Sequence, residues 1–214
     1  MEIAIAFPLL IILFSGMVEF GFVLNYYLAL LDGTREAARF YSNADPFEDG
    51  YALDPANCQC PISECPNEDA VDAADSDCDR SLFYSGAAAM VKAALEPSDA
   101  QDTSRKIVLD PAIDDIIITV LSVEDGVVTR YPSGTGAYHQ YNNQDSKFKL
   151  EPSEPDPVLE LLIPDAPDTG VLIVEVVYGY TQILNLPWLD PFLPEPTMLR
   201  AYTVMPLVAA EPVN

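Results

Sequence analysis

The N-terminal part of the chain is an almost unbroken run of apolar residues. Between Ile3 and Leu31 the only charged residue is Glu19. The apolar residues surround the helical axis instead of forming one stripe, so a helix here has to be buried on all sides, in lipid or among other helices. At about 1.5 Å per residue it is roughly 44 Å long, which is enough to cross a bilayer.

A helical pattern continues beyond the apolar run. Arg35 and Arg39 stand four residues apart on one face, and we predict a single helix that ends at about Asn43. We therefore treat residues 1–43 as one helix, apolar over 1–31, whose second half is amphipathic with its charged residues facing water. The apolar side chains expected to dock on a globular head are Leu30, Leu31, Ala37, Ala38 and Phe40.

The remainder of the chain, residues 44–214, is predicted to form that head. Residues 116–123 and 127–131 flank an Asp-Gly turn and predict a hairpin, and further strands are expected at 172–181 and 199–207. Four antiparallel strands can pack one face against the second half of the first helix. The expected fold class is therefore α+β, with a long N-terminal helix on a small antiparallel sheet.

One further helix and two loops complete the predicted head. Residues 81–96 are rich in alanine, begin with Ser81 and are followed by Pro97, as helix boundaries prefer. A Cys- and Asp-rich loop is expected at 54–79. A Pro-rich loop at 132–170 is expected to be irregular surface rather than another core layer.

Composition restricts the partners of the head. The chain carries 10 Lys and Arg against 34 Asp and Glu, a formal net charge of −24, and the acidic residues fall almost entirely after Asp32. Such a surface repels nucleic acid and anionic lipid, so we expect no nucleic-acid partner. The simplest interpretation of the acidity is solubility and adaptation to salt, heat or divalent cations.

The cysteines Cys58, Cys60, Cys65 and Cys78 all lie in the 54–79 loop. An even number of cysteines in an exported domain favours two disulfides, and three pairings are possible. Their spacing matches no usual pair of zinc knuckles. We therefore treat them as disulfide candidates that stabilise a loop with few core residues.

The head offers few residues for chemistry. Asp72, Asp75, Asp77 and Asp79 could donate oxygen ligands to calcium, but the turn glycine and terminal glutamate of a helix-loop-helix calcium site are missing, and a solvated acidic loop is the simpler interpretation. The only histidine, His139, has no cysteine or nucleophile motif nearby, and the chain lacks Gly-x-Ser-x-Gly and phosphate loops. We expect neither enzymatic activity nor a cofactor other than calcium.

Four positions in or before the apolar run carry hypotheses about assembly and processing. Pro8 lacks a backbone donor and either kinks the helix or is a tolerated early-helix proline. An ionised Glu19 in hydrocarbon costs about 2.5–3.5 kcal/mol on insertion scales, so it requires a partner, a proton or a protein-lined environment. Glu2 can pair with the α-amino group of a neighbouring copy or be solvated at the interface. Because no basic residue precedes the run, Met1 is interpreted either as near the processed end of a mature product or as a start codon.

Two motifs in this segment resemble those of TadE-like pilins and pseudopilins. The opening residues 1–21 combine an acidic start, a proline before a leucine-rich run, and Gly-x-x-Glu-Phe-Gly at 16–21, and Arg-Glu-Ala-Ala-Arg follows at 35–39. The late strands at 174–180 and 201–205 are compatible with the same family. One departure is that family members keep a glycine and a few further residues before the acidic position, where this chain has only a methionine.

The resemblance implies processing by a prepilin peptidase, export through the tight-adherence (Tad) apparatus, and polymerisation or pilus priming outside the inner membrane. Our first hypothesis is a structural subunit of an extracellular filament, anchored in the inner membrane before assembly and polymerising with itself through its apolar helix. One alternative is a minor pseudopilin that primes or caps a Tad-type pilus. Another is a monomeric, membrane-anchored module that binds a ligand or cations.

Overall fold

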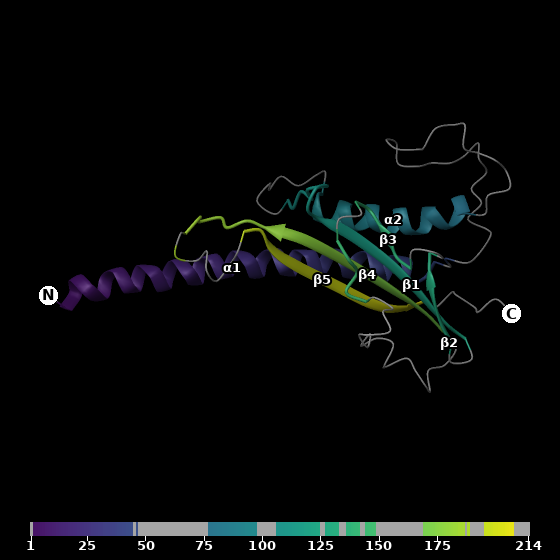
Figure 1. Cartoon of the computed structure of the whole chain (residues 1–214), viewed down its shortest axis with the longest axis horizontal. Helices are drawn as coiled ribbons and strands as arrows, with labels where there is room; N and C mark the ends of the chain where they lie inside the picture. The colour runs from purple at the N-terminus through teal and green to yellow at the C-terminus, as the bar shows by residue number, and fades with distance from the viewer. Residues whose placement is uncertain are drawn as a thin grey trace.

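The computed structural model confirms the α+β class, with a long N-terminal helix, a second helix and a small antiparallel sheet (Figure 1). The long helix projects from the head toward the N-terminus, while the sheet and the second helix lie along its other half. The structure describes residues 2–44, 46, 77–97, 106–124, 127–132, 136–141, 144–148, 169–186, 188 and 195–207.

The long helix α1, Glu2–Tyr41, ends just before the predicted boundary. It continues without a break through Pro8, so the proline does not end the helix. At its C-terminal end the Ser42 backbone N–H donates to the Ala38 carbonyl at 2.8 Å, and the Ser42 hydroxyl donates to the Arg39 carbonyl at 3.0 Å. These bonds satisfy carbonyl groups that would otherwise lack a partner at a helix end.

The sheet contains the predicted hairpin and both predicted late strands. β1 (Asp115–Glu124) and β2 (Val127–Tyr131) form the hairpin, β4 (Thr169–Tyr180) pairs with β1, and β5 (Thr197–Leu207) pairs with β4. The strand order is β2-β1-β4-β5, and the pairings are antiparallel. Branched apolar residues dominate β1 and β4, which suits strands buried within a sheet.

Alternate residues of the sheet face α1 and form one hydrophobic core with it. The α1 residues Leu30, Ala37 and Ala38 are fully buried in this core, as predicted, and Leu31 packs partly buried against it. Phe40 is 63 % exposed, so the prediction that it docks on the head is wrong. It lies at the edge of the face of α1 that packs on the head. Its ring packs against the ring of Tyr41, with the centroids 5.3 Å apart.

The second helix α2, Asp77–Leu95, joins the same core and starts before the predicted Ser81. Acidic residues in its first turn favour this earlier start, because they interact well with the positive end of the helix dipole. Two glycines lie where the helices meet. A Cβ on Gly86 would lie 2.3 Å from the Tyr41 hydroxyl oxygen, and one on Gly33 would lie 3.3 Å from Leu95 Cδ2.

The opposite face of the sheet is covered by part of the segment that was expected to be irregular surface. β3, Tyr138–His139, pairs with β1, and Phe148 is buried against the outward-facing Leu121 and Ile173. The prediction of a surface loop at 132–170 is therefore wrong for this part. Its polar composition concealed a strand and a buried aromatic residue.

Several predicted residues lie outside the part of the chain that the structure describes. They are Met1, Cys58, Cys60, Cys65, Asp72 and Asp75. Of the predicted 54–79 loop, residues 77–79 are described, and they form the start of α2. Disulfide pairing therefore stays a prediction.

Candidate assembly helix and the Glu19 site

The N-terminal half of α1 is apolar and exposed. We call residues 6–24 of α1 the stem. The most apolar stretch of this helix is only 6 % buried within the protein, and the helix is long and apolar enough to cross a membrane. The large apolar side chains exposed along the stem are Phe7, Leu9, Leu10, Ile11, Ile12, Leu13, Phe14, Met17, Phe20 and Leu24.

An exposed surface of this kind requires a cover. Burying a leucine or phenylalanine side chain completely is worth about 1.5–3 kcal/mol, and the stem presents a whole row of them. Exposed apolar patches of this extent mark contacts with lipid or with other protein surfaces. Within the described structure, the stem is therefore the surface that we expect to be covered by lipid or by another protein surface.

The carboxylate of Glu19 lies within the stem and yet is fully buried. It accepts a hydrogen bond of 2.5 Å from the Tyr180 hydroxyl, one of 2.9 Å from the Ile183 backbone N–H and one of 3.0 Å from the Leu184 backbone N–H. The sequence predicted that this side chain needs a partner, a proton or a protein-lined environment. The chain supplies a partner and a protein-lined environment from its own head, because the segment after β4 folds over the helix at this point.

Aromatic packing positions the end of β4 over the stem. The Tyr26 ring of α1 stacks on the Tyr178 ring, with centroids 5.8 Å apart, and meets the edge of the Tyr180 ring at 5.4 Å. Tyr178 and Tyr180 alternate with Gly179, so both rings point to the α1 side of the sheet. This arrangement brings the Tyr180 hydroxyl onto Glu19.

Both phenols remain proton donors at neutral pH. Burial raises the pKa of Tyr178 to about 12, with smaller contributions from Tyr26 and Asp114. Burial also raises the pKa of Tyr180, and the hydrogen bond to Glu19 raises it further, because a phenolate beside a carboxylate would be repelled. The Tyr180 hydroxyl therefore keeps its proton and donates a hydrogen bond to Glu19.

The other predicted site residues are not brought to Glu19. Glu2 begins α1, and Pro8 lies between it and the exposed middle of the stem. Cys78, Asp77 and Asp79 lie in the first turn of α2. Among the described residues, no cluster of His, Cys, Asp and Glu could hold a metal ion.

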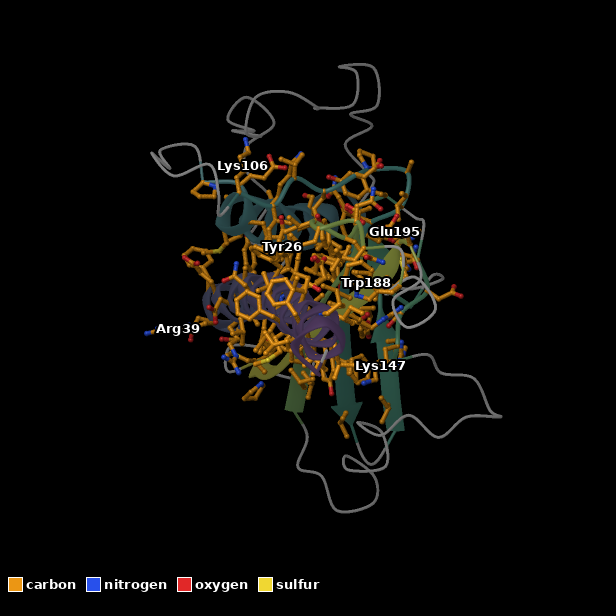
Figure 2. The ribbon with its side chains drawn as sticks, turned by 90° about the vertical axis from the view of Figure 1, so that its left-hand side faces the viewer. Tyr26, Arg39, Lys106, Lys147, Trp188 and Glu195 are labelled. Atoms are coloured by element: carbon orange, nitrogen blue, oxygen red, sulfur yellow. The ribbon has the colours of Figure 1, made fainter. Side chains whose placement is uncertain are left out.

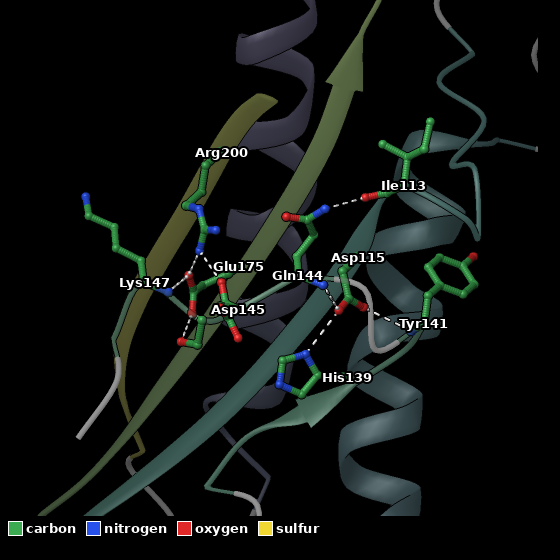
Figure 3. Close-up of polar contacts among 10 residues, drawn as sticks. Ile113, Asp115, His139, Tyr141, Gln144, Asp145, Lys147, Glu175 and Arg200 are labelled. Atoms are coloured by element: carbon green, nitrogen blue, oxygen red, sulfur yellow. Dashed lines mark hydrogen bonds and ion pairs between the residues drawn. The ribbon is translucent and has the colours of Figure 1, made fainter. Parts of the chain in front are cut away.

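On the outer face of the sheet, the carboxylates of Asp115 and Glu175 are also buried (Figure 3), and neither was predicted from the sequence. Asp115 faces His139 Nδ1 at 3.0 Å and accepts hydrogen bonds from the Tyr141 N–H at 2.9 Å and the Gln144 N–H at 3.3 Å. It thereby holds the segment around β3 against β1. An acidic residue at the start of an otherwise apolar strand was the available signal.

Glu175 has the same role on β4. It accepts hydrogen bonds from the Lys147 backbone N–H at 3.0 Å, from Arg200 Nη1 at 3.2 Å and from the Ser146 hydroxyl. Its side chain is fully buried, whereas that of Arg200 is 28 % exposed. Both outer carboxylates are thus satisfied by the chain itself, and their arrangement is that of structural anchors.

The N-terminal helix is the part of the chain that matches a known protein family. Residues 1–39 match the family of TadE-like proteins, which confirms the resemblance over that segment. No curated protein and no solved structure matches the chain. The match relates the chain to the Tad pilus, and together with the exposed apolar helix it indicates a membrane anchor.

Proposed function

We propose that this protein is a structural subunit of an extracellular pilus-like filament, in which the stems of many copies form a bundle. The observation that carries the proposal is the division of α1 into two halves. One face of its C-terminal half packs into the core of the head, and its N-terminal half is exposed and apolar. A helix of this kind can pass from lipid to a bundle of identical helices without any change in the head.

The Glu19 site supports this transfer. Burial of an unpaired carboxylate in lipid or in a bundle is costly, but this carboxylate already has three donors from its own head. The stem therefore needs no new charge partner when its surroundings change. Glu2 is left as the carboxylate that can pair with a neighbouring copy during assembly.

The proposal includes partners before and during assembly. The inner membrane holds the stem first, a prepilin peptidase processes the chain, and the Tad-type machinery moves subunits into the filament. The family match of residues 1–39 supports these partners. The proposal assigns the protein no catalytic activity and no cofactor, because packing of apolar helices is sufficient for the role.

The test is to produce the full chain together with a Tad-type apparatus and shear the cell surface. We expect filaments in negative stain, with this chain as their main component by quantitative mass spectrometry. A chain present only in trace amounts in filaments of another subunit would instead indicate a minor pseudopilin. Detergent-soluble monomers with no filaments would contradict both and favour a membrane-anchored binding module.

A further inference from the structure

The segment after β4 exposes large apolar side chains at the base of the stem. We call residues 181–186 and 188 the apolar loop. Within it Ile183 is 48 % exposed, Leu184 is 39 % exposed and Trp188 is 40 % exposed. In Figure 2, viewed from the N-terminal end of α1, Trp188 lies on the head beside the helix.

Several contacts hold the apolar loop in place. Its backbone N–H groups at 183 and 184 donate to Glu19, which fixes its level along α1. The Gln182 N–H donates to Glu195 Oε1 at 3.1 Å, and the Leu186 N–H donates to Gln182 Oε1 at 3.2 Å. Asn185 has a φ of 45°, a left-handed conformation that asparagine tolerates better than most residues. The backbone donors thus face the protein while the apolar side chains remain accessible.

The spacing of Glu2 and Glu19 along α1 is close to the thickness of the hydrocarbon core of a bilayer. Glu2 and Glu19 are the acidic residues on either side of the uncharged residues 3–18 of α1. At about 1.5 Å per residue they are roughly 26 Å apart, and the hydrocarbon core of a bilayer is about 30 Å thick. If α1 crosses the membrane, residue 2 can lie near one border, and Glu19 with the apolar loop near the other.

We propose that the apolar loop is a membrane-interface contact. Before assembly it seats the head on the lipid headgroups, with Ile183, Leu184 and Trp188 inserted at the level where the acyl chains begin. Tryptophan is enriched at this level because its ring is apolar and its N–H can still reach water or headgroups. The loop also covers Glu19, so that lipid does not meet the carboxylate.

The charge of the chain selects the kind of lipid. A net charge of −24 repels anionic headgroups, so the partner surface is zwitterionic lipid such as phosphatidylcholine or phosphatidylethanolamine. The inference rests on membrane anchoring and does not depend on filament formation. Its failure would therefore leave the proposed filament role untouched, and filaments can be sought separately in sheared material.

The chain contains a single tryptophan, so the fluorescence of Trp188 reports directly on the loop. The full chain is placed in phosphatidylcholine nanodiscs, one copy per disc, with bromine atoms either near the headgroup end or near the middle of the bilayer. We expect the shallow bromines to quench Trp188 at least about twice as strongly as the deep ones, because the ring lies at the interface. No quenching by either lipid, or stronger quenching by the deep one, would overturn the proposal.

Two variants test whether Glu19 sets the position of the loop. Glu19→Ala removes the acceptor and is expected to lower the shallow quenching by about half or more, as the loop loses its attachment. Ser15→Ala is the matched control, because the Ser15 hydroxyl donates only within its own helix, to the Ile12 carbonyl at 3.0 Å. Unchanged quenching in Glu19→Ala would contradict the positioning role. If Trp188 is unquenched in nanodiscs but shifts to shorter emission wavelengths in filaments, a neighbouring stem is its partner and the lipid proposal is wrong.

Discussion

The Tyr180 hydroxyl donates a hydrogen bond of 2.5 Å to the carboxylate of Glu19, across 161 positions of sequence. The contact joins the end of β4 to the apolar part of α1. Because Glu19 is the only charge between Ile3 and Leu31, its burial under the head leaves a stem that presents no charged side chain to its surroundings. Lipid or other apolar helices around the stem would then meet no charged side chain.

Substitution of Tyr180 by phenylalanine tests the strength of this contact. Tyr180→Phe removes one of the three donors to a buried carboxylate, and we expect the free energy of unfolding to fall by about 1.5–3 kcal/mol. The measurement is urea unfolding of the full chain in detergent micelles. Tyr202→Phe is the matched control, because Tyr202 lies on the outer face of β5 and is 38 % exposed. Equal losses in the two variants would contradict a special role for the Glu19 contact.

The raised pKa values of Tyr178 and Tyr180 predict a loss of stability at alkaline pH. Each phenol has an ordinary pKa of 10.0 and a higher value in the folded protein, about 12 for Tyr178. The fold therefore favours the neutral form of both phenols. The contribution of Tyr178 is complete below pH 10.0 and is lost as the pH rises through about 12, and that of Tyr180 is also lost at alkaline pH. Absorbance of the phenolate should show two tyrosines that titrate late in the wild-type chain and one in Tyr180→Phe. Titration of all tyrosines near pH 10 in a folded chain would contradict the prediction.

Much of the fold could be predicted because local patterns agree with tertiary packing. The Asp-Gly turn between two branched apolar runs gave the hairpin of β1 and β2, with Glu124 opposite Val127. The long apolar run gave α1 and its exposed half. Phe40 was assigned to the core because it is apolar and follows Ala37 and Ala38. It lies at the edge of the face that α1 packs on the head, and periodicity alone does not show how wide that face is.

For the Glu19 site, the sequence predicted the need for a partner but not which groups supply it. The cost of a charge in an apolar helix showed that Glu19 needs a partner, but nothing local identifies a donor 161 positions away. Two of the donors are the backbone N–H groups of Ile183 and Leu184. Almost every residue type has such a group, so the sequence does not mark these two as donors. The outer carboxylates Asp115 and Glu175 were missed for the same reason, since most of their donors are backbone groups of a segment with a loop-like composition.

Gly86 is predicted to be required for the contact between α2 and α1. A methyl group at this position would lie 2.3 Å from the Tyr41 hydroxyl oxygen and 3.1 Å from Cζ of the same ring. Overpacking typically costs about 1–3 kcal/mol, which exceeds the gain of up to about 1 kcal/mol from replacing glycine by alanine in a helix. We therefore expect Gly86→Ala to lower the thermal midpoint of the head.

Gly21→Ala is the control for this substitution. Gly21 lies within α1, and no atom would lie within 4 Å of an added Cβ. The helix gain should dominate there, and the variant should be as stable as the wild-type subunit or slightly more stable. A stabilised Gly86→Ala would show that the Tyr41 ring moves aside, and would contradict tight packing of the helices.

Phe148 and Phe40 form a matched pair that tests the corrected view of the core. Phe148 is 1 % exposed and packs against Tyr202 with ring centroids 5.0 Å apart, whereas Phe40 is 63 % exposed. Phe148→Ala should lower the free energy of unfolding by about 3–5 kcal/mol, and Phe40→Ala should lower it by about 0.5 kcal/mol or less. Urea unfolding of both variants gives the comparison. If Phe40→Ala lowered the free energy of unfolding by as much as Phe148→Ala, Phe40 would dock on the head after all.

In the proposed filament, the apolar side chains of each stem are buried against the stems of other copies. The most direct measurement is crosslinking of sheared filaments with a short thiol-reactive linker after Leu13→Cys, since Leu13 is 63 % exposed in the stem. Val108→Cys, on the head and 60 % exposed, and the wild-type chain are the controls. We expect ladders of crosslinked subunits for Leu13→Cys in filaments and monomers for the same variant at one copy per nanodisc. Monomers in both preparations would contradict the proposal.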